Sequence, residues 1–395
     1  MIGRSLGLTR TARVTFDEEL RLEGGGALPE YTLAYETYGR LDGRGANAIL
    51  ACHALSGDAH AAGVSDDPAA PSAVDGVGAD EQKRSRGGVG WWDGMIGPGK
   101  AFDTDRYFVL CINVLGSCRG STGPRSTDPR TGHRYDSDFP IVTVGDMVRA
   151  ERRLLDHLGV PSLLGVSGGS LGGMQALEWA VRYPEFVRGC IPIATTARLA
   201  PMGLAWSAIG RNAIMADPRW RGGRYEDGKG PAAGLAVARM IGHVTYLSSI
   251  SIAEKFGRRM QDRDDYSYSF GPDFAVESYL RHQGDSFTRR FDANSYLYLS
   301  RALSYFDLAR SWGQGSLERA MGRARARFLV LSFSSDWLYP TSDSAALVEA
   351  LRSTGGDVES HVIESTYGHD AFLLEEAALT GHIERFLAET YEGVR

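Results

Sequence analysis

The chain lacks several features that would assign it to a membrane or to nucleic acid. No run of about 18 apolar residues is present, so no transmembrane helix is expected. The net charge of −6 argues against nonspecific nucleic-acid binding, which requires an excess of basic residues. The first eight residues have no apolar core typical of a signal peptide. We therefore expect a cytoplasmic, globular protein, and 395 residues predict two domains or one domain with a large insertion.

Cysteine is scarce, and its spacing excludes the common metal sites. The four cysteines form no C-x-x-C pair and have no histidine partners at zinc-finger intervals, so no metal site is expected. Cys52, Cys111 and Cys190 lie in or beside apolar runs, which is typical of buried free thiols in a reducing compartment. Cys118 lies in a glycine-rich loop, and its role stays open. A phosphate-binding P-loop is also missing, because Gly99-Lys100-Ala101 lacks the final hydroxyl residue.

The segment 165–173, GVSGGSLGG, contains the first candidate for chemistry. An apolar run precedes it and a helical pattern follows it, which is the strand–turn–helix context of a nucleophile elbow. The motif G-x-S-x-G fits around both Ser167 and Ser170. We favour Ser170, because only this serine is followed at once by an uninterrupted helical pattern.

Two later segments could complete a catalytic triad with this serine. Asp336 follows the apolar run 327–333, and His369 lies in the loop after the alternating run 358–364. The chain order Ser, Asp, His is that of α/β-hydrolase triads. His369 would act as the general base, and Asp336 would orient its imidazole. Taken alone, the aspartate could be a helix cap and the histidine a solvated loop residue.

The periodicity predicts a doubly wound, mostly parallel sheet, the α/β-hydrolase fold, with an inserted helical lid. Strands are expected at 31–38, 48–52, 107–112, 162–166, 327–333 and 358–364. A helix is expected at 146–158, before the elbow, and five more are expected at 202–216, 234–246, 251–261, 274–282 and 293–305. The sheet domain is therefore assigned to 1–199 and 319–395, and the lid to 200–318. The small, polar, glycine- and proline-rich segment 64–90 predicts a long exposed loop.

Longer blocks of the sequence resemble the homoserine O-acetyltransferases of methionine biosynthesis nearly end to end. The blocks that carry this resemblance are 53–57 (HALSG), 90–99 (GWWDGMIGPG), 113–124 (NVLGSCRGSTGP), 168–174 (GGSLGGM), 239–243 (RMIGH), 291–296 (FDANSY) and 367–372 (YGHDAF). The sequence departs from the family at Ser167, where an aliphatic residue is usual, and in a longer 64–90 loop. Neither departure falls on a triad position.

The resemblance implies a ping-pong acyl transfer from acetyl-CoA to the hydroxyl of L-homoserine. Ser170 would carry the acyl group and His369 would then activate homoserine. The backbone N–H groups of Leu55 and Leu171 would form the oxyanion hole, where each donor typically contributes about 3 kcal/mol. Coenzyme A would enter through a tunnel under the lid, and no permanently bound cofactor is expected. A homodimer through the helical lid is also implied.

The resemblance also assigns residues to the two substrates. Arg239 would pair with the carboxylate of the amino acid, Asp370 with its ammonium, and Tyr246 would assist. Leu338 stands where relatives that prefer succinyl-CoA tend to carry arginine, so an acetyl donor is favoured. Succinyl-CoA as donor and L-serine as acceptor stay open. An esterase with the same triad and a non-catalytic binding module are the more remote alternatives.

Overall fold

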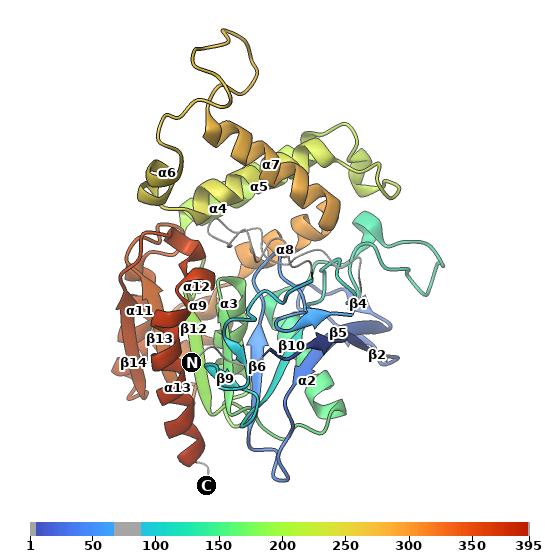
Figure 1. Cartoon of the computed structure of the whole chain (residues 1–395). Coiled ribbons are helices and arrows are strands. Elements are labelled where there is room, and N and C mark those ends of the chain that lie inside the picture. Colours follow the sequence, from blue (N-terminus) through green and yellow to red (C-terminus); the bar gives the residue numbers. More distant parts are fainter. Residues whose placement is uncertain (1–4, 67–87, 394–395) are drawn as a thin grey trace.

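The structure is a computed structural model, and it describes residues 5–66 and 88–393 (Figure 1). Its centre is an eight-stranded sheet with strand order β14-β13-β12-β11-β6-β10-β5-β2. These strands are β2 (Ala12–Phe16), β5 (Tyr31–Tyr38), β6 (Ala48–Cys52), β10 (Phe108–Ile112), β11 (Gly165–Gly169), β12 (Gly189–Ile193), β13 (Arg327–Phe333) and β14 (Val358–Ile363). The six from β14 to β10 run parallel, whereas β5 is antiparallel to both β10 and β2. The predicted fold class is confirmed.

Short paired strands lie outside this sheet. They are β1 (Leu8–Thr9) with β7 (Val64–Ser65), β3 (Leu20–Arg21) with β4 (Ala27–Leu28), and β8 (Ile96–Gly97) with β9 (Phe102–Asp103). The pairing of β1 with β7 corrects the expected exposed loop at its first residues. Val64 and Ser65 align with Leu8 and Thr9, and Gly88 is buried. Residues 67–87 of that expected loop lie outside the described residues.

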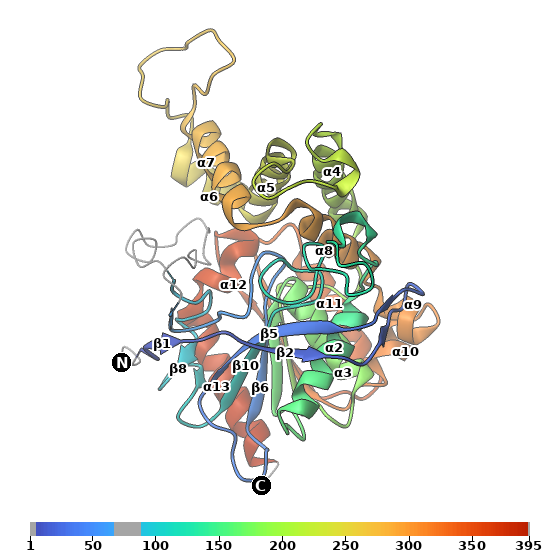
Figure 2. The same cartoon turned by 90° about the vertical axis from the view of Figure 1, so that its right-hand side faces the viewer.

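Helices cover both faces of the sheet and bury its strands (Figure 2). One face is packed by α13 (Glu376–Glu392), and α12 (Ala371–Leu374) lies just before it. The other face is packed by α2 (Val144–His157), α3 (Leu171–Arg182) and α11 (Thr341–Ser353). Because both faces are covered, all residues of β6, β11 and β12 are buried.

A block of helices lies over one end of the sheet (Figure 1). Residues 200–318 contain no strand, and their helices are α4 (Pro201–Ala216), α5 (Ala232–Tyr246), α6 (Ser249–Phe256), α7 (Ala275–Arg290), α8 (Ala293–Tyr305), α9 (Leu308–Gly313) and α10 (Leu317–Met321). The helices α4 to α7 form the upper layer, and α10 packs against α11 of the sheet domain. Single 3₁₀ turns occur at Asp136–Asp138, Arg221–Gly223 and Gly368–Asp370.

Two helices of this block differ from their predicted bounds by more than two residues at one end. The helix α6 ends at Phe256 rather than at residue 261, because Gly257 has a φ of 51°, which interrupts the helix. The helix α7 extends to Arg290 rather than to residue 282. Its added turns bury Gln283, Gly284 and Phe287, and the packing of this buried face stabilises the longer helix.

The helical block is tied to the sheet domain by hydrogen bonds near the ends of the strands. Tyr298 of α8 donates to the carbonyl oxygen of Phe139 at 2.5 Å. Trp337, which follows β13, donates through Nε1 to the carbonyl oxygen of Leu247 at 2.9 Å. The first bond joins α8 to the segment before α2, and the second joins the end of α5 to the loop that contains Asp336.

No single helix in the described part of the chain is long and apolar enough to cross a membrane. The helices α5 and α6, which are bent by 104° relative to each other, are long and apolar enough only when they are taken together, by length and composition alone.

A buried carboxyl group under the sheet makes stability depend on pH. Glu151 of α2 is fully buried and accepts one hydrogen bond, from Trp179 Nε1 at 2.8 Å. Burial raises the pKa of Glu151 to about 7, although the bond from Trp179 opposes this shift. The folded state thus retains a proton that the unfolded chain has lost, and stability decreases as pH rises through about 7.

We expect Glu151→Gln to raise the free energy of unfolding at pH 8 by up to about 3 kcal/mol and to have little effect near pH 5. The neutral amide keeps an oxygen for Trp179 and removes the cost of a buried charge. Urea unfolding at the two pH values measures the difference. The exposed Glu364→Gln serves as the control, and an equal effect of both substitutions would contradict the assignment.

Candidate active site

The turn after β11 places Ser170 in a strained backbone conformation. Its φ of 58° and ψ of −121° lie outside the regions that most residues adopt, and α3 begins at the next residue. Close packing around this turn requires glycine both before Ser170, at Gly169, and after it, at Gly172. A Cβ atom on Gly172 would lie 2.1 Å from the carbonyl oxygen of Cys52, and one on Gly169 would lie 2.3 Å from the ring of Phe372. The geometry is that of a nucleophile elbow.

The two candidate serines occupy different environments. Ser167 lies inside β11, is completely buried, and donates to the carbonyl oxygen of Ile191 at 3.2 Å. Ser170 is 9 % exposed and lines a cavity beneath the helical block. Only Ser170 can therefore meet a substrate without unfolding of the strand.

Asp336 and His369 form a buried pair at the ends of neighbouring strands. His369 Nδ1 lies 2.8 Å from Asp336 Oδ2, and the other carboxylate oxygen accepts the backbone N–H groups of Leu338 and Tyr339, each at 3.0 Å. Because the carboxylate accepts from Nδ1, that nitrogen holds the proton. Nε2 is then unprotonated and can accept a proton from a nucleophile.

Aromatic rings enclose the imidazole of His369. The ring of Tyr339 lies 5.0 Å from it, that of Phe372 5.7 Å, and that of Tyr246 5.8 Å. The side chain of Tyr339 also interacts with that of Ser170. The described residues show no hydrogen bond between Ser170 and His369, and such bonds are often long in unliganded sites. Tyr339 was not identified from the sequence.

Two backbone amides next to Ser170 are free to bind an anion. Within the described residues, neither the N–H of Leu55 nor that of Leu171 donates a hydrogen bond. Leu171 is the first residue of α3, so its N–H also benefits from the positive end of the helix dipole. Leu55 and Ser170 line the same cavity, and the assignment of the two N–H groups to an oxyanion hole stays a prediction.

His53 shapes the loop that presents Leu55. Its Nε2 accepts the backbone N–H of Val114 at 3.1 Å, so Nδ1 is the protonated nitrogen and donates to the carbonyl oxygen of Ala54 at 2.7 Å. Burial lowers the pKa of His53, which keeps the ring neutral and this pattern intact. His53 thus acts as a positioning residue. The sequence contained it in the block 53–57 but did not indicate this role.

A pair of opposite charges lies beside the triad under the helical block. Arg239 of α5 and Asp370, next to His369, are both buried. Burial raises the pKa of Asp370 to about 6, while the charges of His369 and Arg239 oppose the rise. The guanidinium of Arg239 lies 5.8 Å from the ring of Tyr246, and its Nε has no hydrogen-bond partner in the described residues. The structure therefore brings all three predicted acceptor residues together.

Leu338 faces the same cavity as Ser170. This cavity has a volume of about 60 Å³ and includes Leu55, Tyr246, Leu338 and Tyr339 among its lining residues. Leu338 contributes an apolar side chain and offers no partner for a carboxylate on the acyl group. A small apolar acyl group fits this lining better than a charged one.

Comparison with known proteins identifies the family. Residues 48–376 match the α/β hydrolase fold family. The homoserine O-acetyltransferase of Solidesulfovibrio magneticus is 54% identical over 94% of this chain and 89% of its own length. The chain belongs to the homoserine O-acetyltransferase family.

Solved structures of this family and of esterases share the fold. The homoserine O-acetyltransferase of Bacillus anthracis superposes with a TM-score of 0.85 at 29% identity, covering 97% of this chain and 98% of the other. Esterase E22 superposes with a TM-score of 0.83 at 28% identity, covering 95% of this chain and all of the other. Overall shape thus does not distinguish acyl transfer from hydrolysis, and the distinction must come from the site.

Proposed function

We propose that the protein transfers the acetyl group of acetyl-CoA to the hydroxyl of L-homoserine, giving O-acetyl-L-homoserine and CoA. The observation that carries this proposal is the buried pair of Arg239 and Asp370 beside His369. A zwitterionic acceptor needs one fixed cation and one fixed anion, and an esterase has no use for such a pair. The names of the family members support the same reaction.

In the first half-reaction, Ser170 takes the acetyl group. Its Oγ attacks the thioester carbonyl carbon while His369 Nε2 accepts the hydroxyl proton. The tetrahedral oxyanion is held by the N–H groups of Leu55 and Leu171. When the C–S bond breaks, the imidazolium returns the proton to the sulfur, and CoA leaves as the thiol.

In the second half-reaction, the acceptor hydroxyl replaces CoA. His369 takes its proton, the oxygen attacks the acetyl carbon, and the bond to Ser170 Oγ breaks as that oxygen regains a proton. Arg239 pairs with the acceptor carboxylate and Asp370 with its ammonium. The helical block covers this site and limits access of water to the acetyl-enzyme, which favours transfer over hydrolysis.

We expect Arg239→Ala to affect only the second half-reaction. Loss of a charge-assisted hydrogen bond costs about 1.5–3 kcal/mol, so kcat/KM for homoserine should decrease about 10- to 150-fold. The rapid release of CoA that reports acylation should stay near native. Stopped-flow detection of the CoA thiol, with and without homoserine, separates the two steps.

The control for this experiment is Arg211→Ala, since Arg211 is another buried arginine of the helical block and contacts Ser300. It should change both half-reactions in parallel or neither of them. An equal loss of acylation in Arg239→Ala would mean that Arg239 serves CoA or folding. If neither step changed, the assignment of Arg239 to the acceptor carboxylate would be wrong, and the esterase alternative would be favoured.

The identity of the acyl donor and its role as a co-substrate are also proposals. We infer acetyl rather than succinyl transfer because Leu338 is apolar. Acetyl-CoA acts as a co-substrate and not as a bound cofactor. A homodimer through the helical block and a cytoplasmic location stay predictions from the sequence.

A further inference from the structure

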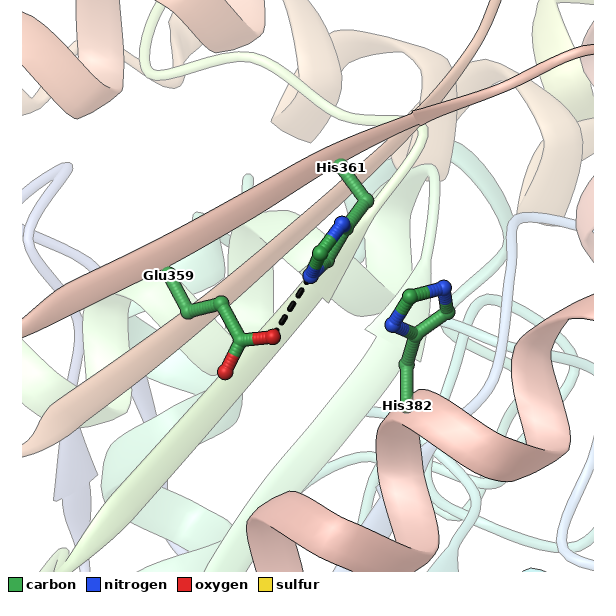
Figure 3. Close-up of side chains that lie close together, drawn as sticks. All are labelled: Glu359, His361 and His382. Carbon is green, nitrogen blue, oxygen red and sulfur yellow. Dashed lines mark hydrogen bonds and ion pairs between the residues drawn. The ribbon is translucent and has the colours of Figure 1, made fainter.

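A second cluster of ionisable side chains lies at the edge of the sheet (Figure 3), and none of its residues lines the cavity of Ser170. Glu359 and His361 are two residues apart on the edge strand β14, so their side chains extend from the same face of the strand. His382 extends toward them from α13, the helix that packs on this face. A strand and a helix from separate parts of the chain thus bring one carboxylate and two imidazoles together.

The ligating atoms of these three residues are close enough to share one ion. One ligand atom from each lies within 4.8 Å of the other two. His361 Nε2 is 2.5 Å from Glu359 Oε1, and the rings of His361 and His382 are 3.9 Å apart. Two bonds of 2.0–2.1 Å from a zinc ion span at most about 4.2 Å, so side-chain adjustments of less than about 1 Å would complete the site.

The cluster also contains an unsatisfied polar atom. His382 Nδ1 is buried and has no hydrogen-bond partner in the described part of the chain. An imidazole nitrogen that has no other partner is available to bind a metal ion.

We propose that Glu359, His361 and His382 bind one divalent transition-metal ion, of which Zn²⁺ is the representative. Two imidazoles and one carboxylate are a donor set that zinc prefers, and water would occupy the fourth position. The ion would replace the contact of Arg385 with Glu359 and join α13 to the edge strand β14. The ion would lie outside the triad and would not contact the reacting atoms.

The joining of these two elements gives the ion a structural role. Within the described residues, β14 is the edge strand of the sheet and pairs with β13 alone, so an ion shared with α13 would add a second attachment. Because the chain passes from β14 directly into the loop with His369, a metal that stabilises β14 also stabilises this loop. Any ligand that binds only the folded state raises Tm in a concentration-dependent manner.

The test is calorimetric titration of the full-length, tag-free, chelator-treated protein with ZnCl₂. We expect saturable binding of one Zn²⁺ per chain and a Tm that increases with Zn²⁺. His361→Ala and His382→Ala should each weaken binding by more than about 10-fold, because even indirect partners of a metal ligand affect affinity 10- to 100-fold. Co²⁺ should give the intense visible absorption of a four-coordinate site in the wild type only.

His133→Ala is the matched control, since His133 is an exposed loop histidine outside the cluster. It should bind Zn²⁺ as the wild type does. Thermal unfolding without metal shows whether each variant is folded. Absence of one-to-one binding by the wild type would overturn the proposal, as would unchanged affinity in folded His361→Ala and His382→Ala.

Discussion

Ser170→Ala should abolish the acetyl-enzyme and reduce turnover on the order of 10⁶-fold. The substitution removes the hydroxyl of the elbow residue that lines the cavity beneath the helical block. The strained φ of 58° is imposed by the flanking backbone, so the turn should persist in the variant. Mass spectrometry of the intact protein after incubation with acetyl-CoA alone measures the adduct.

Ser167→Ala is the matched control, because Ser167 lies three residues earlier in the same motif. Its hydroxyl only donates to Ile191 within the sheet, and its loss should cost about 1 kcal/mol of stability. The acetyl adduct should form as in the wild type. An adduct located on Ser167, or one retained by Ser170→Ala, would contradict the assignment of the nucleophile.

Asp336→Asn should lower kcat by about 10⁴-fold while the protein stays folded. In the native site, Oδ1 accepts from the N–H groups of Leu338 and Tyr339. The asparagine oxygen would take this position, so its NH₂ group would face His369 Nδ1. That nitrogen would then have to accept, the proton would move to Nε2, and His369 could no longer take the proton of Ser170.

Asp343→Asn provides the comparison for this effect. Asp343 lies in the first turn of α11, the helix that follows Asp336, and burial raises the pKa of Asp343. Steady-state kinetics should show near-native turnover for this variant, with circular dichroism confirming that both variants are folded. Near-native turnover in Asp336→Asn would mean that another carboxylate orients His369.

Local patterns predicted most of the elements that position the site. The strands β5, β6 and β13 and the helix α8 have the predicted bounds, because the sequence alternates or repeats clearly over their whole length. Prediction was less accurate where long-range packing decides. The strand β7 forms only because β1, more than fifty residues earlier, aligns with it, and no local pattern in so short a segment indicates this pairing.

In the candidate site, too, some residues follow from local sequence patterns and others depend on long-range contacts. Ser170, Asp336 and His369 follow strands and can be located from motif and order alone. The roles of His53 and Tyr339 depend on contacts with Val114 and with the ring of His369, which the fold alone brings together. The cluster of Glu359, His361 and His382 was missed for the same reason, because no spacing rule links a strand pair to a helix residue.

The central claim is acetyl transfer from acetyl-CoA to L-homoserine. Its most direct test is the rate of CoA release with acetyl-CoA or succinyl-CoA as donor and with homoserine, serine or water as acceptor. We predict that acetyl-CoA with homoserine gives the highest kcat/KM, and that O-acetyl-L-homoserine accumulates in a one-to-one ratio with CoA. Equal rates with water and with homoserine, and free acetate as the product, would contradict the account.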